Sequence, residues 1–246
     1  MIQSNGRIPQ HNLLTFLVLF WSIAAVAQSK TTSVGLAYRP IFPLNFIGTG
    51  EETQIVDDVN FTTGLQHGFS GGMIIRRGFT DQLALEVGIN YVKRNYTLSI
   101  TDSSTIIEDQ FRIIGYEIPV SILALIQLGE AVYMNASLGA GLDAAASSVR
   151  TAGAEFEQIA IKKHTVNPAL NANVGWEYRT PSSGSIYLGA TYHRPIAEIY
   201  SNSVLYRKNG NDVIARNQLS GSYLTVDLRY YFAAEKDPKK KKKTRE

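Results

Sequence analysis

The sequence predicts an all-β protein: an eight-stranded antiparallel up-and-down transmembrane β-barrel with short periplasmic turns and long extracellular loops. Three observations support this fold class. An export-type leader opens the chain, eight later segments alternate apolar and polar residues with a period of two, and the connections between these segments alternate long and short. Together they place one apolar face of every strand against lipid and enclose the opposite face.

The N-terminal segment has the composition of a secretory signal peptide. Residues 1–12 are polar, residues 13–25 are almost entirely apolar, and Ala25-Val26-Ala27 supplies the small residues that precede a cleavage site. A membrane-spanning helix is the alternative, but such a helix needs about 20 apolar residues, more than this stretch offers. We therefore expect residues 1–27 to be removed and the mature chain to begin at Gln28, outside the cytoplasm.

Period-two alternation recurs in eight segments after residue 30. In segment 83–91, for example, Leu85 and Ile89 share one face, while Glu86 and Asn90 lie on the other. This period is typical of a strand with two different faces. The predicted strands are 32–39, 68–77, 83–91, 111–126, 132–142, 166–178, 186–192 and 224–232.

The connections between these strands fall into two classes. Short turns rich in Gly, Pro, Ser and Asp alternate with long polar loops, and the series begins and ends with a long loop. A meander gives this order when its short turns lie at one end and its long loops at the other. The short turns lie near 78–81, 127–130 and 180–184. The long loops lie near 41–66, 99–108, 145–162 and 197–216.

The orientation of the apolar face separates a membrane barrel from a soluble one. A soluble β-sandwich or lipocalin-like barrel has the same period with its apolar face inward. Here one face is almost uninterrupted apolar, whereas the other mixes Gly, Ser, Asn and charges, as a polar lumen requires. Aromatic residues also gather at strand ends, where interfacial girdles belong. We assign the aromatic girdle to Tyr38, Tyr91, Trp176, Tyr178, Tyr230 and Phe232.

Several of these segments resemble a known family. Residues 116–123 (Tyr-Glu-Ile-Pro-Val-Ser-Ile-Leu), Gly139-Ala140-Gly141 and the closing strand 228–232 are similar to the small outer-membrane β-barrel domain of Bacteroidota-type bacteria, which includes the PorT-like proteins. The resemblance spans roughly residues 30–232 and implies an eight-stranded barrel, with some members tied to type IX secretion. Phe232 also resembles the aromatic ending that barrel assembly machinery reads, although fourteen residues follow it.

Charged residues are expected inside the barrel. An eight-stranded barrel has an interior just wide enough for side chains to fill, and an unpaired buried charge costs several kcal/mol. We therefore expect five basic and five acidic side chains to pair into a lumen charge network that fixes strand register. A gated ion path lined by the same groups is the alternative. The ten residues are Arg39, Arg76, Glu86, Arg94, Glu117, Asp143, Glu177, Arg179, Asp227 and Arg229.

The sequence predicts neither catalysis nor a cofactor. The absence of cysteine excludes disulfides, thiolate metal sites and a Cys nucleophile, and no Gly-rich phosphate loop or His-Glu-x-x-His motif occurs. Some outer-membrane barrels modify lipid A with a His and a Ser near the outer leaflet. His67, His164 and His193 fall near that end, but neither His164 nor His193 has a Ser and an acid spaced on its own strand. We expect no catalytic, cofactor-binding or metal-binding residues.

The formal net charge of +3 comes from the C-terminal tail. Residues 233–246 contain seven basic and three acidic residues, including the run 239–243, which leaves 16 basic and 18 acidic residues in 28–232. The main domain therefore lacks the basic footprint of a nucleic-acid-binding protein. We expect the tail to be disordered, and contact with an anionic envelope polymer or an acidic partner is the alternative.

The sequence thus divides the chain into a signal peptide (1–27), an outer-membrane β-barrel domain (28–232) and a disordered basic periplasmic tail (233–246). The expected location is the bacterial outer membrane. Expected partners are outer-membrane lipids and lipopolysaccharide, the barrel assembly machinery during insertion, and envelope proteins. The expected role is structural or interactive through the extracellular loops, for example in a type IX secretion assembly. The alternatives are a narrow gated channel for small solutes and a lipid A-modifying enzyme.

Overall fold

The computed structural model describes residues 32–43, 50–208 and 210–233. The predicted signal peptide and nearly all of the predicted basic tail lie outside these residues. Within the described ranges, every regular element is a β-strand. No helix in those ranges is long and apolar enough to cross a membrane.

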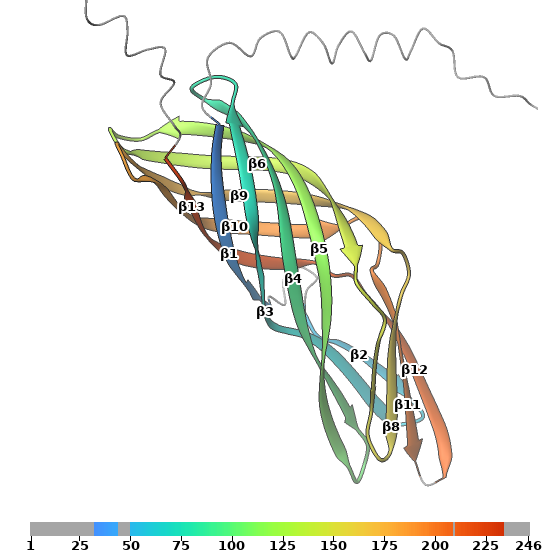
Figure 1. Ribbon diagram of the computed structural model, residues 1–246. Helices are drawn as coiled ribbons and strands as arrows, with labels where there is room; N and C mark the ends of the chain where they lie inside the picture. The colour runs from blue at the N-terminus through green and yellow to red at the C-terminus, as the bar shows by residue number, and fades with distance from the viewer. Residues whose placement is uncertain (1–31, 44–49, 209, 234–246) are drawn as a thin grey trace, which may run out of the picture.

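Eight strands close into one antiparallel ring. They are β1 (Thr32–Phe42), β3 (Val59–Gly78), β4 (Leu83–Thr101), β5 (Ile106–Gln127), β6 (Val132–Ala145), β9 (Val166–Thr180), β10 (Gly184–Pro195) and β13 (Tyr223–Tyr231). Their order is β1-β13-β10-β9-β6-β5-β4-β3, and pairing of β1 with β3 closes the ring (Figure 1). Each strand therefore pairs with the strand before and the strand after it in this series. The predicted eight-stranded up-and-down barrel is confirmed.

Five further strands in the described residues lie beyond one end of the ring. They are β2 (Glu52–Val56), β7 (Val149–Ala152), β8 (Phe156–Lys162), β11 (Tyr200–Lys208) and β12 (Asn211–Leu219). Strand β2 forms a hairpin with β3, and the other four make a second sheet in the order β12-β11-β8-β7. Figure 1 shows them at the bottom of the view, beside the far halves of β3, β4 and β5.

The four predicted long connections exist, but they are largely β-strand and not irregular loop. Strands β2, β7, β8, β11 and β12 lie within them, and β3, β4 and β5 extend into them beyond the predicted strand ends. Only the turn at 102–105 separates β4 from β5. The predicted strands were too short because the face that is apolar changes at the end of the wall. The apolar residues change parity along β4 and β5, and a register shift between Gln66 and Phe69 reverses the inward face of β3.

Strand β4 shows this change most clearly. Its outward side chains are apolar from Leu83 to Tyr91 and polar from Lys93 to Thr101. Its inward side chains change in the opposite sense, from a half that includes buried Glu86, Asn90 and Arg94 to a half made of buried Tyr96, Leu98 and Ile100. The alternation itself is unbroken. One half therefore has the pattern of a membrane barrel, and the other has the pattern of a sheet in water.

The far halves of β3, β4 and β5 pack with β2 and the second sheet around an apolar core. We call this region (52–66, 96–112, 149–162 and 200–219) the distal sandwich. Burial of apolar side chains from both sheets holds it together without requiring hydrogen bonds between the sheets. Its core includes Val59, Phe61, Leu98, Ile100 and Phe111 from the first sheet and Phe156, Tyr200, Val204, Tyr206 and Val213 from the second.

Candidate functional site

Apolar side chains cover the outer surface of the barrel. One from each barrel strand illustrates the belt: Leu36, Ile75, Ile89, Ile122, Leu138, Val174, Leu188 and Val226 are between 41% and 70% exposed. Water-soluble monomers rarely expose such a continuous apolar surface. On β4 the belt runs from Leu83 to Tyr91, about 26 Å along a strand at 3.3 Å per residue, which suits the hydrocarbon layer of a tilted-strand barrel.

Aromatic residues mark both edges of this belt. At the edge nearer the distal sandwich, Tyr38, Phe69, Tyr91 and Tyr116 form a row across four neighbouring strands, with ring centroids 6.2, 5.8 and 6.0 Å apart. At the short-turn edge, Trp176, Tyr178, Tyr230 and Phe232 are between 38% and 58% exposed. The structure thus places two predicted girdle residues in the row nearer the distal sandwich and four at the short-turn edge. Phe69 and Tyr116 were not predicted as girdle members.

The lumen contains the ten predicted charges in two groups. Nine of them are at most 8% exposed, and Arg179 is partly exposed at the mouth. The group near the short turns, which we call the proximal network, contains seven residues. They are Arg39, Arg76, Glu86, Glu177, Arg179, Asp227 and Arg229.

Each acid of the proximal network contacts two arginines. Glu86 lies 3.3 Å from Arg76 and 2.7 Å from Arg229. Asp227 pairs with Arg229 and lies 3.3 Å from Arg39. Glu177 accepts from Arg76 and, at 2.6 Å, from Arg179. The network joins strands on opposite sides of the barrel, so it fixes their relative positions.

Neutral side chains complete the proximal network. Tyr231 donates its hydroxyl to Glu86 at 2.6 Å, Thr225 donates to Asp227 at 2.6 Å and Asn135 donates to Glu177 at 3.0 Å. The Arg76 guanidinium lies 3.8 Å from the centre of the Tyr231 ring. Sequence reasoning missed these partners, although their inward parity was readable from the period-two pattern.

A cavity of about 610 Å³ lies between the proximal network and the short turns, at that end of the barrel. Its lining includes Arg76, Glu177, Arg179, Tyr133 and Gln127. Arg179 stacks over the Tyr133 ring at 3.9 Å. The lumen is therefore open to the short-turn side only as far as this network.

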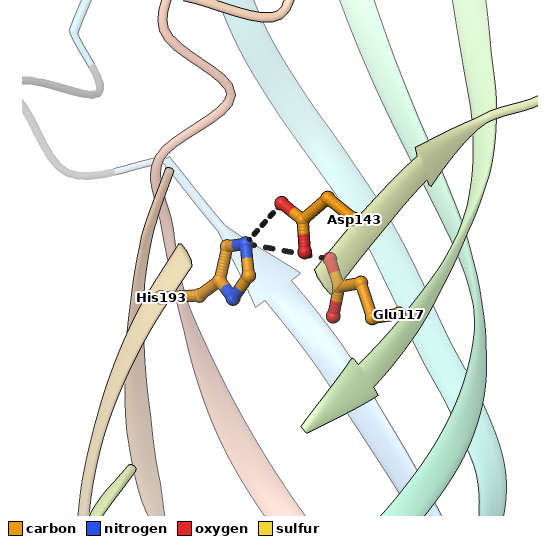
Figure 2. Close-up of side chains that lie close together, drawn as sticks. All are labelled: Glu117, Asp143 and His193. Carbon is orange, nitrogen blue, oxygen red and sulfur yellow. Dashed lines mark hydrogen bonds and ion pairs between the residues drawn. The ribbon is translucent and has the colours of Figure 1, made fainter. Parts of the chain in front are cut away.

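The second group, which we call the distal cluster, lies toward the distal sandwich and contains Arg94, Glu117, Asp143 and His193. Arg94 Nη2 lies 2.8 Å from Glu117 Oε1, and His193 Nε2 lies 2.8 Å from Asp143 Oδ2. Figure 2 shows Glu117, Asp143 and His193 converging from three strands. The hydroxyl of Tyr223 donates to both oxygens of Glu117 at 2.7 Å.

The three histidines have different surroundings. His67 is exposed on the barrel wall and contacts the Phe42 ring edge-on at 5.4 Å, and His164 is exposed. His193 is 2% exposed. Its two acidic neighbours come from β5 and β6 and not from its own strand. The sequence search considered single strands, so it could not find this grouping.

A different set of polar contacts links the two sheets of the distal sandwich at its tip. Asp102, in the β4–β5 turn, accepts from the backbone N–H groups of Ser104 and Thr105 at 2.7 and 2.8 Å and from the Tyr206 hydroxyl at 2.9 Å. The hydrogen bonds from Ser104 and Tyr206 lower the pKa of Asp102 to about 2. Burial and the hydrogen bond to Asp102 raise the pKa of Tyr206.

A buried amide ladder crosses the second sheet. Thr151 donates to Gln158 at 2.7 Å, Gln158 to Asn202 at 2.6 Å, and Asn202 to Asn217 at 2.8 Å. The ladder ties all four strands together on the face toward the sandwich interior. It lies in segments that were expected to be loops, so the sequence analysis did not find it.

These observations define the class of the protein. A closed barrel with an even number of antiparallel strands, an apolar outer belt between aromatic girdles and a polar interior belongs to the outer-membrane β-barrel class. The assignment rests on the strand order, register and exposure in this chain.

Comparison with known proteins adds three solved structures. No family model and no curated protein sequence matches the chain. The outer membrane protein OprG from Pseudomonas aeruginosa aligns over 83% of this chain and 97% of its own, with 10% identity and a TM-score of 0.44. Ail, the attachment invasion locus protein of Yersinia pestis, aligns over 82% of this chain and 96% of its own, with 12% identity and a TM-score of 0.33. The outer membrane protease OmpT from Escherichia coli gives 84%, 97%, 9% and 0.34.

Proposed function

We propose that this protein is a closed, non-enzymatic outer-membrane barrel that holds the distal sandwich outside the cell for contact with external partners. The polarity change along β4 is the observation that carries this proposal. The same strand is suited to lipid in one half and to water in the other. A folded sandwich with its own apolar core presents a fixed surface, which costs less ordering on binding than a flexible loop.

The filled lumen supports a holding role over steady conduction. The proximal network crosses the barrel interior, the distal cluster lies beyond it, and the core of the sandwich follows. Eight-stranded barrels have little interior space beyond their side chains. The buried charges therefore act as a plug that keeps the wall and the sandwich in register.

Cysteine labelling tests the orientation. The chain has no cysteine, so a single introduced thiol is the only one. Ser103 lies at the tip of the sandwich and Ser182 in a short turn, and both are exposed. A membrane-impermeant maleimide is expected to label Ser103→Cys on intact cells, but Ser182→Cys only after the outer membrane is permeabilised. The reverse pattern would contradict the proposal.

A narrow gated channel is the second candidate, because polar residues line the lumen and a cavity of about 610 Å³ opens at one mouth. Planar-bilayer recording separates the two roles. The plug predicts no steady openings from the wild-type protein. Steady openings that are abolished by Glu117→Gln or Arg229→Gln would support the channel.

The finer role that we propose is that of an accessory in an envelope assembly such as type IX secretion, with envelope proteins, lipopolysaccharide and the barrel assembly machinery as partners. The resemblance of residues 116–123, 139–141 and 228–232 to the PorT-like group supports it. Cross-linking in envelopes from Ser103→Cys, with Ser182→Cys as the matched control, tests it. A partner captured from the tip position alone is the expected result.

Mass spectrometry of lipid A tests whether the protein is non-enzymatic, as we propose. The ring nitrogens of His193 contact Asp143 and Asn171, so the imidazole already has two partners inside the barrel. We expect the mass spectrum of lipid A to be the same with and without the protein. A mass change that is lost in His193→Ala would replace this proposal with an enzymatic one.

A further inference from the structure

Three groups of metal-ligand type meet inside the barrel at the base of the distal sandwich. Glu117 on β5, Asp143 on β6 and His193 on β10 place their ligand atoms within 4.8 Å of one another, and all three residues are buried. Figure 2 shows the Asp143 carboxylate beside both the imidazole of His193 and the carboxylate of Glu117. Convergence from three strands makes this an arrangement of the tertiary fold and not of one local motif.

The orientation of His193 leaves one ring nitrogen facing the acids. Nδ1 lies 2.6 Å from Asn171 Oδ1, an acceptor, so Nδ1 carries a proton in this arrangement. Nε2 lies 2.8 Å from Asp143 Oδ2 and 3.6 Å from Glu117 Oε1. A lone pair on Nε2 would then face two carboxylates, which is repulsive unless a proton or a metal cation is bound to Nε2. An outer acceptor on the other nitrogen is also the usual arrangement of a metal-bound histidine.

Unpartnered oxygens lie at the same level of the barrel. Asp143 Oδ1 and Asn90 Oδ1 are buried and have no hydrogen-bond partner among the described residues. Asp143 is 7% exposed and Asn90 is 2% exposed. Asn90 is the register partner of Glu117, and Glu117 is the register partner of Asp143. Buried acceptors without donors are costly, so the Asp143 oxygen favours a bound cation, whereas Asn90 Oδ1 lies toward Gly72 on β3.

The local charge balance has room for a cation. Arg94 lies 2.8 Å from Glu117 and 3.9 Å from Asp143, and Tyr223 donates to Glu117. Two carboxylates and one guanidinium leave one negative charge, which a proton on Nε2 or a bound metal ion would neutralise. A bound cation would compete with Arg94 for the Glu117 carboxylate, because Arg94 lies closer to Glu117 than to Asp143. Asp143 and His193 are therefore the stronger ligands of the set.

We propose that Glu117, Asp143 and His193 form a binding site for a divalent transition-metal ion of the Zn²⁺ type. An imidazole nitrogen selects such ions over Ca²⁺ and Mg²⁺, which prefer ligand sets made of oxygen. The 3.6 Å separation of His193 Nε2 and Glu117 Oε1 is close to the ~3.4 Å between two tetrahedral ligands that each lie ~2.1 Å from zinc. The closer Asp143 would move away from His193 on binding. The ion would fasten β5, β6 and β10 together where the barrel meets the sandwich.

Metal retention by the full-length protein tests the site. Because the ligands are buried, the protein is refolded into detergent with Zn²⁺, without a histidine tag, and free metal is removed before elemental analysis. We expect one retained Zn²⁺ per folded chain, at least tenfold less in His193→Gln and in Asp143→Asn, and no change in the matched control His164→Gln. Circular dichroism and heat-modifiable gel migration confirm that each variant is folded.

X-ray absorption of the zinc-loaded wild-type protein tests the ligands without any substitution. The expected first shell contains only nitrogen and oxygen, with the multiple-scattering signature of one imidazole. Failure of the folded wild type to retain Zn²⁺, equal retention in folded His193→Gln, or equal retention of Ca²⁺ would overturn the proposal. These outcomes are independent of the cysteine labelling that tests the orientation of the barrel.

Discussion

The barrel wall and the distal sandwich are built partly from the same strands, yet their faces have opposite polarity. In the wall, outward Ile89 is 55% exposed and inward Glu86 is 8% exposed, whereas farther along β4 the inward Leu98 is 1% exposed. Alternation alone therefore does not determine which face is buried. The surrounding medium does, because lipid accepts apolar side chains and water accepts polar ones.

The two regions also differ in whether their sheets have unpaired edge strands. The wall is a closed ring, in which β1 pairs with both β13 and β3. Within the described residues, β2 pairs with β3, β12 with β11 and β7 with β8, so the sandwich keeps open edges. Unpaired backbone groups are very costly in hydrocarbon and tolerable in water. Closure is therefore required where the strands cross lipid and is relaxed beyond it.

The largest expected effect comes from removing a charge inside the wall. Glu86→Gln leaves Arg76 and Arg229 with a neutral partner in place of a buried carboxylate, and the loss of one member of a buried ion pair costs about 3–5 kcal/mol. Urea unfolding of the refolded barrel measures the change. The matched control is Glu108→Gln, at an exposed position on β5. Equal effects of the two substitutions would show that the lumen is not a dry charge network.

A pair of leucines sharpens the comparison between the regions. Leu98→Ala opens a cavity in the sandwich core, where the side chain is 1% exposed, and is expected to cost about 3 kcal/mol. Leu138→Ala, at a wall position that is 70% exposed, is expected to cost about 0.5 kcal/mol or less, the scale of Leu transfer into lipid. Protease sensitivity of the sandwich and urea unfolding give the two values. A larger loss at Leu138 would reverse the assignment of the buried face.

Arginine on the outward face tests where the lipid ends. Ile89→Arg places a charge within the apolar belt and is expected to lower barrel stability in bilayers by about 1–2 kcal/mol, below the midplane cost of about 2–4 kcal/mol because Ile89 lies near the belt edge. Thr97→Arg lies on the same face of β4, beyond the girdle residue Tyr91, and is expected to have little effect. Folding titrations in lipid vesicles measure both. Similar losses at the two positions would place Thr97 in the membrane.

The smallest expected effect is a pH response at the sandwich tip. The pKa of Asp102 is lowered to about 2, whereas the pKa of an Asp in an unfolded chain is about 3.9. The contribution of Asp102 is therefore complete above about pH 4 and is lost as the pH falls toward about 2. The hydrogen-exchange protection factor of the 102–105 turn, which is corrected for the intrinsic rate at each pH, is expected to fall over this interval in the wild type, but not in Asp102→Asn. An unchanged wild-type exchange pattern would show that the turn does not depend on the carboxylate.

Much of the wall could be predicted from the sequence, because a period of two identifies faces wherever the outward side is uniformly apolar. Leu85, Leu138, Val174 and Val226 were assigned outward on that basis, and the structure places them there. The sandwich could not be predicted in the same way. Beyond the wall the apolar residues change parity on β4 and β5, and a register shift interrupts the alternation on β3, so a search for one continuous apolar face ended these strands too early.

The candidate site shows a second limit of sequence reasoning. Alternation predicts Glu117 and Asp143 on the inward face, and both are buried, but it does not report which inward residues meet across the barrel. His193 lies on β10 and Asp143 on β6, with β9 between them in the ring. Such a contact depends on strand tilt and barrel closure, which the sequence pattern does not specify.

The central claim is that one strand passes from lipid to water while its alternation continues. Spin labels at the outward positions 85, 87, 89, 97, 99 and 101 of β4, in protein reconstituted into bilayers, test it directly. The account predicts high collision rates with oxygen and low rates with a water-soluble nickel complex at 85–89, and the opposite at 97–101. Uniform accessibility to either reagent along the whole strand would contradict it.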